Sequence, residues 1–226
     1  ASEEASELIL LGDIFDFWYE WKHVIPAKLF PWLAALKQVT STGLAVSIYP
    51  GNHDFRLVGF LESEIGLKVR PELDRRQLLG SKFVLHHGDG LDPKEWPYLL
   101  MKRILRSSIA DKLFSLLHSD LGMWLAHQAS KQDKMMRWSP MEVADSLERS
   151  LKVLLTKEDE FMVQGHVHQA CRLLFSECKV TTLPAFTLPS RGFVRFDGCQ
   201  MHFDFLRPEA DGSQVINLKN IGDTHV

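Results

Sequence analysis

Leu-Ile-Leu-Leu-Gly-Asp-Ile-Phe-Asp, residues 8–16, is the most informative stretch of this chain. Four apolar residues stop abruptly at Gly12-Asp13. A short apolar run that ends in a turn residue is typical of a buried strand that leads into a loop. Ligands of open α/β proteins gather where such strands end. The stretch therefore predicts a strand over residues 8–12 that delivers Asp13 to a site, as a metal ligand or a general base.

The same pattern recurs three times along the chain, since an apolar run leads each time into a loop where glycine stands beside a ligand-type residue. The three further loops are Gly51-Asn52-His53-Asp54, His87-Gly88-Asp89 and Gly165-His166-Val167-His168. Glycine lets the backbone turn sharply and approach a bound ion closely. One such loop is usually an ordinary turn, but four in succession predict a shared site at the strand ends.

The side chains of these loops suggest the kind of ion. They offer carboxylate, amide and imidazole groups, a mixed set that suits Mn, Fe or Zn. A bridging carboxylate such as Asp13 can hold two ions roughly 3.5–4 Å apart, as in two-metal phosphoryl-transfer sites. In His166-Val167-His168, alternation would put both imidazoles on one side of an extended segment. We therefore expect a site for two divalent ions.

The rest of the chain predicts an α/β frame. Apolar residues at helical spacing indicate a helix over 27–40, between the strands 8–12 and 44–49, which together form a parallel βαβ unit. Residues 67–86 alternate, with a turn at 79–81, and Ser139-Pro140 begins another helix that reaches about residue 156. Residues 161–164 predict a short strand that leads into the loop 165–168. The later segments alternate as antiparallel strands do, and they are 169–175, 178–183, 193–197 and 200–206.

Residues 93–138 form an insert of different character, apolar and helix-compatible, with eight basic side chains against four acidic ones. We expect most of its apolar side chains to pack as the core of a helical subdomain. The alternative is a cap that offers a groove for acyl chains and cations for phosphate or an anionic bilayer. The predicted substrate-binding residues are Lys131, Lys134 and Arg137. In the second case Arg103 and Arg106 would face the membrane.

Composition places limits on the class of protein. A chain of 226 residues with 45% hydrophobic and 24% charged residues is typical of one globular domain. A net charge of −3 gives no reason to expect nucleic acid as a partner. We find no apolar run of about 18 residues and no signal-peptide pattern. Three cysteines without metal-knuckle spacing, Cys171, Cys178 and Cys199, are expected to be reduced core thiols of a cytoplasmic protein.

The order of the four loops, over residues 8–168, resembles the calcineurin-like metallophosphoesterases. This resemblance implies an α/β fold with mixed sheets, a four-layer αββα sandwich, and a dinuclear metal site at the strand ends. Within that superfamily, residues 11–18, residues 51–55 and the helical insert resemble the UDP-2,3-diacylglucosamine hydrolases of lipid A biosynthesis. Protein Ser/Thr phosphatases fit less well, because no Val-Asp-Arg-Gly follows Gly12-Asp13 and because Asp54 stands where they have Glu.

The resemblance also implies a set of metal ligands. Asp13 would bridge the two ions. The second ion would be bound by Asn52, His87 and His166, and the first by His168. Manganese is the expected metal, with Fe or Zn as alternatives. The family opens with an earlier strand that ends in Asp-x-His, so we expect a single domain over residues 1–226 whose first strand is missing.

One loop of this chain departs from the resembling hydrolases. They commonly carry Arg after the Asn, where this chain has His53. Histidine at this place is similar to the general phosphoesterases, in which it donates a proton or stabilises charge on the phosphoryl group. We therefore expect His53, oriented by Asp54, to act as general acid or charge stabiliser. Asn52 is expected to ligate an ion and to contact the phosphate.

The leading functional hypothesis is manganese-dependent hydrolysis of UDP-2,3-diacylglucosamine to UMP and 2,3-diacylglucosamine 1-phosphate. Such a protein would work in the cytoplasm, peripherally on the inner face of the inner membrane. One alternative is a soluble nucleotide phosphodiesterase. Another is a metallophosphoesterase scaffold that has lost its site and acts as a binding module. The missing Asp-x-His keeps the last alternative open, and the five remaining ligands count against it.

Overall fold

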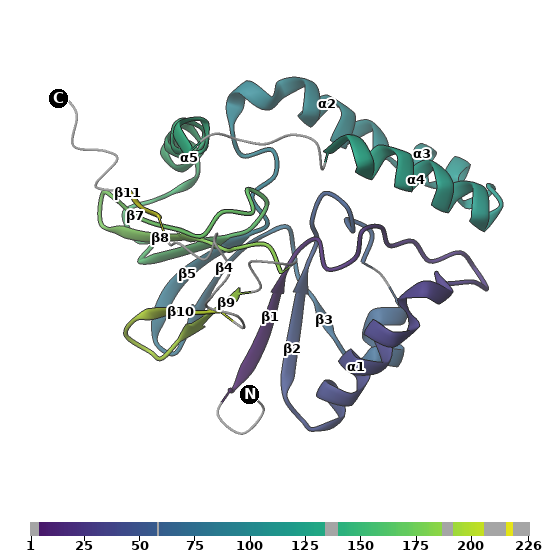
Figure 1. Ribbon diagram of the computed structural model, residues 1–226, viewed down its shortest axis with the longest axis horizontal. Helices are drawn as coiled ribbons and strands as arrows, with labels where there is room; N and C mark the ends of the chain where they lie inside the picture. Colours follow the sequence, from purple (N-terminus) through teal and green to yellow (C-terminus); the bar gives the residue numbers. More distant parts are fainter. Residues whose placement is uncertain (1–4, 58, 134–139, 187–191, 206–215, 219–226) are drawn as a thin grey trace. The chain divides into compact units, whose positions relative to one another are not determined.

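The structure is a computed structural model that describes residues 5–57, 59–133, 140–186, 192–205 and 216–218. The chain forms two compact units, each with a β-sheet and at least one α-helix (Figure 1). The first unit comprises Ala1–Glu72 and Glu95–Arg137, and the second comprises Leu73–Lys94 and Trp138–Val226. The predicted α/β class with mixed sheets and a helical insert is confirmed.

The first unit is built on a three-stranded parallel sheet of order β1-β2-β3. The strands are β1 (Glu7–Leu11), β2 (Ala45–Tyr49) and the short β3 (Lys68–Val69). The turn Ala27–Leu29 and helix α1 (Phe30–Ser41) connect β1 to β2, which confirms the predicted βαβ unit. Leu11 pairs with Tyr49, so the loops that follow β1 and β2 begin side by side.

The core of this unit lies between α1 and the sheet (Figure 1). Leu33 of α1 packs with Val46 and Ile48 of β2. Burial of each such side chain stabilises the fold by about 1.5–3 kcal/mol. Between β2 and β3 the chain forms one wide helical turn, Leu61–Ile65, which buries both of its end residues. It ends at Gly66, whose φ of +84° suits a residue without Cβ.

The helical insert follows a short turn, Pro93–Glu95, and consists of α2 (Trp96–Leu105), α3 (Ser108–Ser115) and α4 (Ser119–Asp133). The Ser107 side chain caps α3 by accepting a hydrogen bond from the Ala110 N–H at 3.2 Å. No helix within the described residues is both long enough and apolar enough to cross a membrane.

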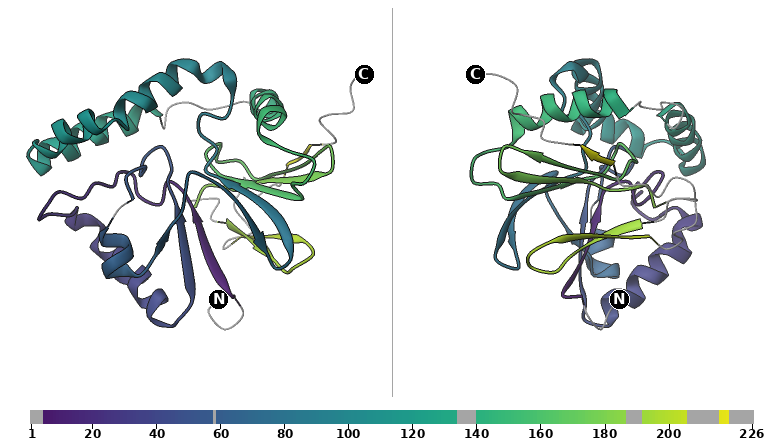
Figure 2. Two further views of the ribbon diagram at one scale, coloured as in Figure 1. Left: turned by 180° about the vertical axis from the view of Figure 1, so that it is seen from behind. Right: turned by 60° about the vertical axis from the view of Figure 1, so that its left-hand side comes forward.

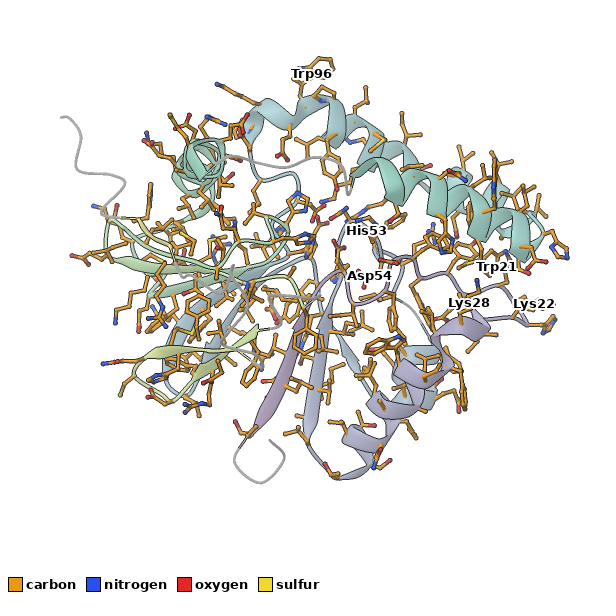
Figure 3. The ribbon with its side chains drawn as sticks, in the orientation of Figure 1. Trp21, Lys22, Lys28, His53, Asp54 and Trp96 are labelled. Carbon is orange, nitrogen blue, oxygen red and sulfur yellow. The ribbon has the colours of Figure 1, made fainter. Side chains whose placement is uncertain are left out.

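The expectation that the helical insert packs its own core is wrong. Neither α2 nor α3, both fully described, buries a residue. Trp96 is 67% exposed and projects away from α2 (Figure 3). A helix buries its apolar side chains only where another helix or strand packs against them. Among the described residues, no element packs against the exposed apolar side chains of these helices. The large exposed apolar residues of the helical insert are Trp96, Leu99, Leu100, Met101, Ile104, Leu105, Ile109, Leu113, Leu116, Leu121, Trp124 and Leu125.

Aromatic side chains attach the inner side of the helical insert to the segment that follows Asp13. The Tyr19 hydroxyl donates to Asp111 Oδ1 at 2.9 Å, and the Tyr19 ring lies 4.7 Å from the ring of Phe114, edge to face. Trp21 also contacts Phe114 and approaches Gly122, where an added Cβ would lie 2.8 Å from the indole. Gly122 is therefore required for this close approach.

The second unit contains a mixed six-stranded sheet of order β11-β7-β8-β6-β5-β4. Its strands are β4 (Leu73–Leu78), β5 (Ser81–His86), β6 (Phe161–Gln164), β7 (Cys171–Phe175), β8 (Cys178–Thr182) and β11 (Ile216–Leu218). β5, β6 and β8 run parallel, whereas β4 and β7 are antiparallel to their neighbours β5 and β8. Leu79 and Gly80 both have positive φ, which confirms the predicted tight turn between β4 and β5.

The two faces of this sheet are covered differently (Figure 2). On one face, α5 (Pro140–Leu154) packs Val143, Leu147 and Leu151, spaced four apart, against the strands. Ser139, the predicted cap of this helix, lies outside the described residues. On the other face, the hairpin of β9 (Gly192–Phe196) and β10 (Met201–Phe205) places Phe196 within 5.1 Å of the rings of Phe83 and Phe161.

The three cysteines are free thiols in different environments. Cys171 and Cys178 belong to the core under α5. Burial raises the pKa of the Cys178 thiol to about 12. The prediction that all three are core thiols is wrong for Cys199, which is exposed beside the turn that joins β9 to β10.

Candidate functional site

The loop after β1 holds Asp13 in an unusual backbone conformation. Gly12 and Asp13 have φ values of +80° and +53°. This left-handed region suits glycine, and Asp is among the few other residues that tolerate it. Non-glycine residues in such conformations cluster at functional sites. The backbone therefore supports the prediction that Asp13 is a site residue.

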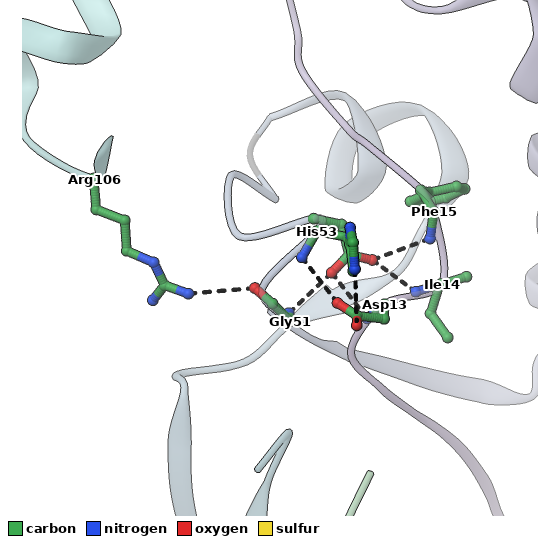
Figure 4. Close-up of polar contacts among 7 residues, drawn as sticks. Asp13, Ile14, Phe15, Gly51, His53 and Arg106 are labelled. Atoms are coloured by element: carbon green, nitrogen blue, oxygen red, sulfur yellow. Dashed lines mark hydrogen bonds and ion pairs between the residues drawn. The ribbon is translucent and has the colours of Figure 1, made fainter. Parts of the chain in front are cut away.

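The loop after β2 lies directly against Asp13 (Figure 4). A Cβ at Gly51 would lie 2.1 Å from Asp13 Oδ1 and 2.5 Å from the Asp13 nitrogen, so only glycine fits at this position. The His53 N–H donates to Asp13 Oδ1 at 2.9 Å. The His53 ring also faces the same carboxylate, with Nε2 3.9 Å from Oδ2. The two strand-end loops of the first unit thus form one cluster around the Asp13 carboxylate.

Asp54 fastens these two loops together. Its Oδ1 accepts hydrogen bonds from the N–H groups of Asp13 at 3.0 Å and Gly51 at 2.9 Å. Its Oδ2 accepts from Ile14 at 2.8 Å and Phe15 at 3.2 Å. Burial raises the pKa of Asp54 to about 6, with a further contribution from the nearby Asp13 carboxylate, although the backbone N–H groups favour the charged form.

These contacts correct the role that the sequence suggested for Asp54. We expected its carboxylate to orient the His53 ring. Instead its oxygens bond the backbone of the two loops, and the His53 ring lies against Asp13. Asp54 is therefore a positioning residue for the loops, and the Asp13 carboxylate faces the imidazole of His53.

The second unit gathers the predicted histidines at the ends of β5 and β6. His87 is buried, and its ring lies 5.4 Å from the ring of His166, edge to face. The Gly165 N–H donates to the His87 carbonyl at 2.7 Å, which joins the two strand ends. A Cβ at Gly88 would lie 3.0 Å from the Cβ of His166, so this loop also depends on a glycine.

The conformation of the segment 166–168 differs from the expectation. His166 and His168 have φ values of +63° and +55°. The segment is therefore not extended, and alternation of side chains does not decide which way the two imidazoles point. Two non-glycine residues of this kind in one short loop, with one residue between them, indicate the same kind of local constraint as at Asp13.

Most of the predicted site residues thus fall into two local clusters, one in each unit. The first unit brings together Asp13, Asn52, His53 and Asp54, and the second contains His87, His166 and His168. Of the predicted substrate-binding residues, Lys131 belongs to α4 and its side chain lies outside the described part of the chain. Lys134 and Arg137 also lie outside the described residues.

The membrane-facing position expected for Arg106 is wrong. Arg106 would have faced a membrane together with Arg103, but its guanidinium turns to the loop after β2, where Nη2 donates to the Gly51 carbonyl at 3.3 Å (Figure 4). Arg103 is exposed. No local pattern distinguishes the two arginines, because helix periodicity alone does not show which neighbour a side chain meets.

The donors of both clusters fit divalent metal ions. The first unit offers a carboxylate that glycine packing and backbone bonds hold in place, with an amide side chain in the adjacent loop. The second unit offers two imidazoles in contact. Oxygen and nitrogen donors of these types suit Mn, Fe or Zn. A site for such an ion is consistent with the side chains of each unit.

Comparison with known proteins supports the predicted resemblance. No family model matches the chain. It is 29% identical to the UDP-2,3-diacylglucosamine hydrolase of Porphyromonas gingivalis over 132 residues, which cover 58% of this chain and 50% of that protein. It is 27% identical to the hydrolase of the same name from Neisseria gonorrhoeae over 174 residues, covering 75% and 71% of the two chains.

A third relative with this name, from Bordetella parapertussis, is 29% identical over 181 residues, covering 78% of this chain and 69% of that protein. The chain thus spans half the length of the Porphyromonas relative and about 70% of the other two. Among solved structures, a zinc complex of Vps29 from Entamoeba histolytica aligns over 90% of this chain and 94% of that chain, with 13% identity and a TM-score of 0.39. A score that low carries no conclusion about fold or function.

Proposed function

We propose that this chain is a metal-dependent phosphohydrolase that cleaves UDP-2,3-diacylglucosamine to UMP and 2,3-diacylglucosamine 1-phosphate. The observation that carries the proposal is the Asp13 carboxylate, which Gly51 approaches closely and which the His53 ring faces. Such a fixed carboxylate at a strand end is what a two-metal phosphoryl-transfer site requires. The choice of substrate rests on the similarity to hydrolases of this name.

The proposed ligands of two divalent ions are Asp13, Asn52, His87, His166 and His168. Manganese is the first choice, with Fe or Zn as alternatives. When bound, the ions would supply an activated water molecule and would neutralise the charge that develops on the phosphoryl group. The proposal rests on the order of the four loops and on the local geometry of Asp13 and of the His87–His166 pair.

The chain's own residues would have separate tasks. His53, with a largely buried ring beside Asp13, would protonate the leaving oxygen or stabilise charge on the phosphoryl group. Asn52 would contact the phosphate. Asp54 would keep the two loops in register through its four backbone bonds. We propose Lys131, Lys134 and Arg137 as further cations for the substrate.

We propose that the helical insert contacts an anionic membrane surface that holds the lipid substrate. Trp96, Leu100 and Ile104 are spaced four apart along α2, and each is more than half exposed. An apolar stripe of this kind next to basic side chains is typical of helices that lie in a bilayer interface. The protein would then act at the inner face of the inner membrane.

A soluble nucleotide phosphodiesterase is the second candidate. The observation that favours it is His53 itself, which stands where the resembling hydrolases commonly carry Arg. A phosphodiesterase would need no acyl groove and no membrane. An inactive scaffold that binds a partner is the third candidate, and the close packing around Asp13 counts against it.

A parallel assay of the full-length protein with Mn²⁺ separates the three candidates. One reaction contains UDP-2,3-diacylglucosamine, and the other contains bis(p-nitrophenyl) phosphate. We expect the lipid nucleotide to be cleaved to UMP with the higher kcat/KM. Faster cleavage of the plain diester would favour the phosphodiesterase, and no metal-dependent cleavage of either would favour the scaffold.

Sedimentation with vesicles tests the membrane proposal separately. We expect the protein to pellet with phosphatidylglycerol vesicles and much less with phosphatidylcholine vesicles. Leu100→Glu should weaken this binding, because it places a charge in the apolar stripe of α2. Val153→Glu is the matched control, since Val153 is also exposed but lies on α5. Equal binding by both variants would contradict the proposed surface.

A further inference from the structure

Arg106 stands at the end of α2, the helix of the helical insert nearest in sequence to the His87 loop. Its N–H donates to the Lys102 carbonyl at 3.0 Å and closes the helix. Its guanidinium forms an ion pair with Glu72, whose other oxygen meets Lys102, and the Arg106 Nη1 to Glu72 Oε2 distance is 2.6 Å. Glu72 therefore holds two cations of α2 in fixed positions.

The guanidinium also contacts the loop that follows β2. Nη2 donates to the Gly51 carbonyl at 3.3 Å, and the guanidinium carbon lies 5.1 Å from the centroid of the Phe55 ring. Gly51 and Phe55 flank Asn52, His53 and Asp54 in sequence. The first unit contains all of these contacting residues, which are Gly51, Phe55, Glu72 and Arg106. Arg106 is thus a positive charge beside the loop that carries two of the proposed site residues.

The bond to Gly51 is the weakest of these contacts. A distance of 3.3 Å lies beyond the usual range for N–H···O hydrogen bonds, and the acceptor is a neutral carbonyl. A phosphate oxygen is a stronger acceptor, because hydrogen bonds between ionised partners are about twice as strong as neutral ones. The Arg106 side chain is 23% exposed, so part of it remains accessible to a ligand at the loop.

We propose that Arg106 binds a phosphoryl oxygen of the substrate, by moving Nη2 from the Gly51 carbonyl to that oxygen. The inference rests on the proposed phosphohydrolase function and assigns a residue within it. Arg106 would provide a guanidinium beside the loop, which itself contains no arginine between Gly51 and Phe55. Glu72 and the Phe55 ring would keep the guanidinium in place during this exchange.

The test compares Arg106→Ala with Arg103→Ala in the Mn²⁺-loaded, full-length protein. Arg103 is the matched control, because it lies on the same helix and is exposed. We expect Arg106→Ala to weaken binding of inorganic phosphate, measured by calorimetry, and to raise KM for the cleaved phosphoester, each about 10- to 100-fold. Arg103→Ala should leave the phosphate affinity, measured without vesicles, within about twofold of the wild type, as is usual for surface changes.

A lysine variant and chemical rescue distinguish binding from structural support. Arg106→Lys should recover part of the phosphate affinity, because it restores the charge without the planar fork. Millimolar guanidinium should restore activity to Arg106→Ala without changing its unfolding midpoint. Phosphate binding by Arg106→Ala equal to that of the wild type would overturn the inference. Absence of hydrolysis by the wild type would instead overturn the proposed function on which it rests.

Discussion

The carboxylate of Asp54 accepts a hydrogen bond from the Asp13 N–H at 3.0 Å, across 41 residues of sequence. The same carboxylate also bonds the Gly51 N–H at 2.9 Å. One buried side chain therefore sets the position of the strand-end loops that follow β1 and β2. The geometry around the Asp13 carboxylate therefore depends on a residue whose own oxygens bond the loop backbone.

Asp54→Asn should destabilise the protein by about 1–3 kcal/mol, because its amide places a donor against backbone N–H groups that need an acceptor. Mn²⁺ binding should weaken as well, since Asp13 would lose its fixed position. Urea unfolding of the metal-free protein and a Mn²⁺ titration measure the two effects. Asp120→Asn is the control, because Asp120 is 93% exposed. Unchanged Mn²⁺ affinity in Asp54→Asn would show that the loops do not need this carboxylate.

Gly51→Ala should cost more stability than alanine at an ordinary glycine. The added methyl would lie 2.1 Å from Asp13 Oδ1, so one of the two loops must move. Gly43→Ala is a useful comparison, because its Cβ would meet nothing within 4 Å, although its φ of +87° is strained. We expect Gly43→Ala to cost about 1–2 kcal/mol and Gly51→Ala clearly more. Equal unfolding midpoints would contradict the tight contact.

His53→Ala should reduce kcat about 10²- to 10⁴-fold with little change in KM, because the proposed role of the ring is exercised in the transition state. Initial rates over a range of substrate concentrations measure both constants. His23→Ala, at an exposed histidine of the same unit, should leave them unchanged. A loss confined to KM would assign His53 to substrate binding instead.

The ion pair between Asp92 and Arg149 should make a pH-dependent contribution to the stability of the second unit. Arg149 Nη2 lies 2.5 Å from Asp92 Oδ2, and this hydrogen bond lowers the pKa of the buried Asp92 carboxyl. A lowered pKa in the folded state gives stability that is present above the unfolded value of about 3.9 and is lost as pH falls below it. Asp92→Asn should therefore cost about 2–3 kcal/mol at pH 7 and less at pH 3.

Urea midpoints of Asp92→Asn and the wild type at the two pH values test this difference. Glu148→Gln is the control on the same helix, because Glu148 pairs with Lys152 at the surface and such pairs contribute at most about 1 kcal/mol. If Asp92→Asn loses the same amount of stability at both pH values, the ionised pair is ruled out as the cause of the loss.

The strand-end loops were predictable because their signal is local. An apolar run followed by Gly12-Asp13 contains both the strand and its end, and the turn at Leu79-Gly80 follows from the alternation on either side. The position of Arg106 was not predictable, because it depends on Glu72 and Gly51, which lie far away in sequence. Tertiary contacts of this kind leave no periodic pattern.

Other differences have equally physical causes. The strand β11 pairs with β7 but contains only three residues, too few for a periodic pattern. The segment 166–168 was assumed to be extended, whereas both of its histidines have positive φ. The apolar residues of α2 have helical spacing whether they face a core or solvent, so their exposure could not be deduced from spacing alone.

The measurement that tests the central claim most directly is Mn²⁺-dependent hydrolysis by the full-length wild type and by Asp13→Ala, assayed side by side with and without EDTA. If Asp13 bridges the ions, the wild type should cleave UDP-2,3-diacylglucosamine only without EDTA. The variant should then be at least about 10³-fold slower, the loss of several kcal/mol expected when metal catalysis is removed. Activity in Asp13→Ala close to that of the wild type would contradict the account.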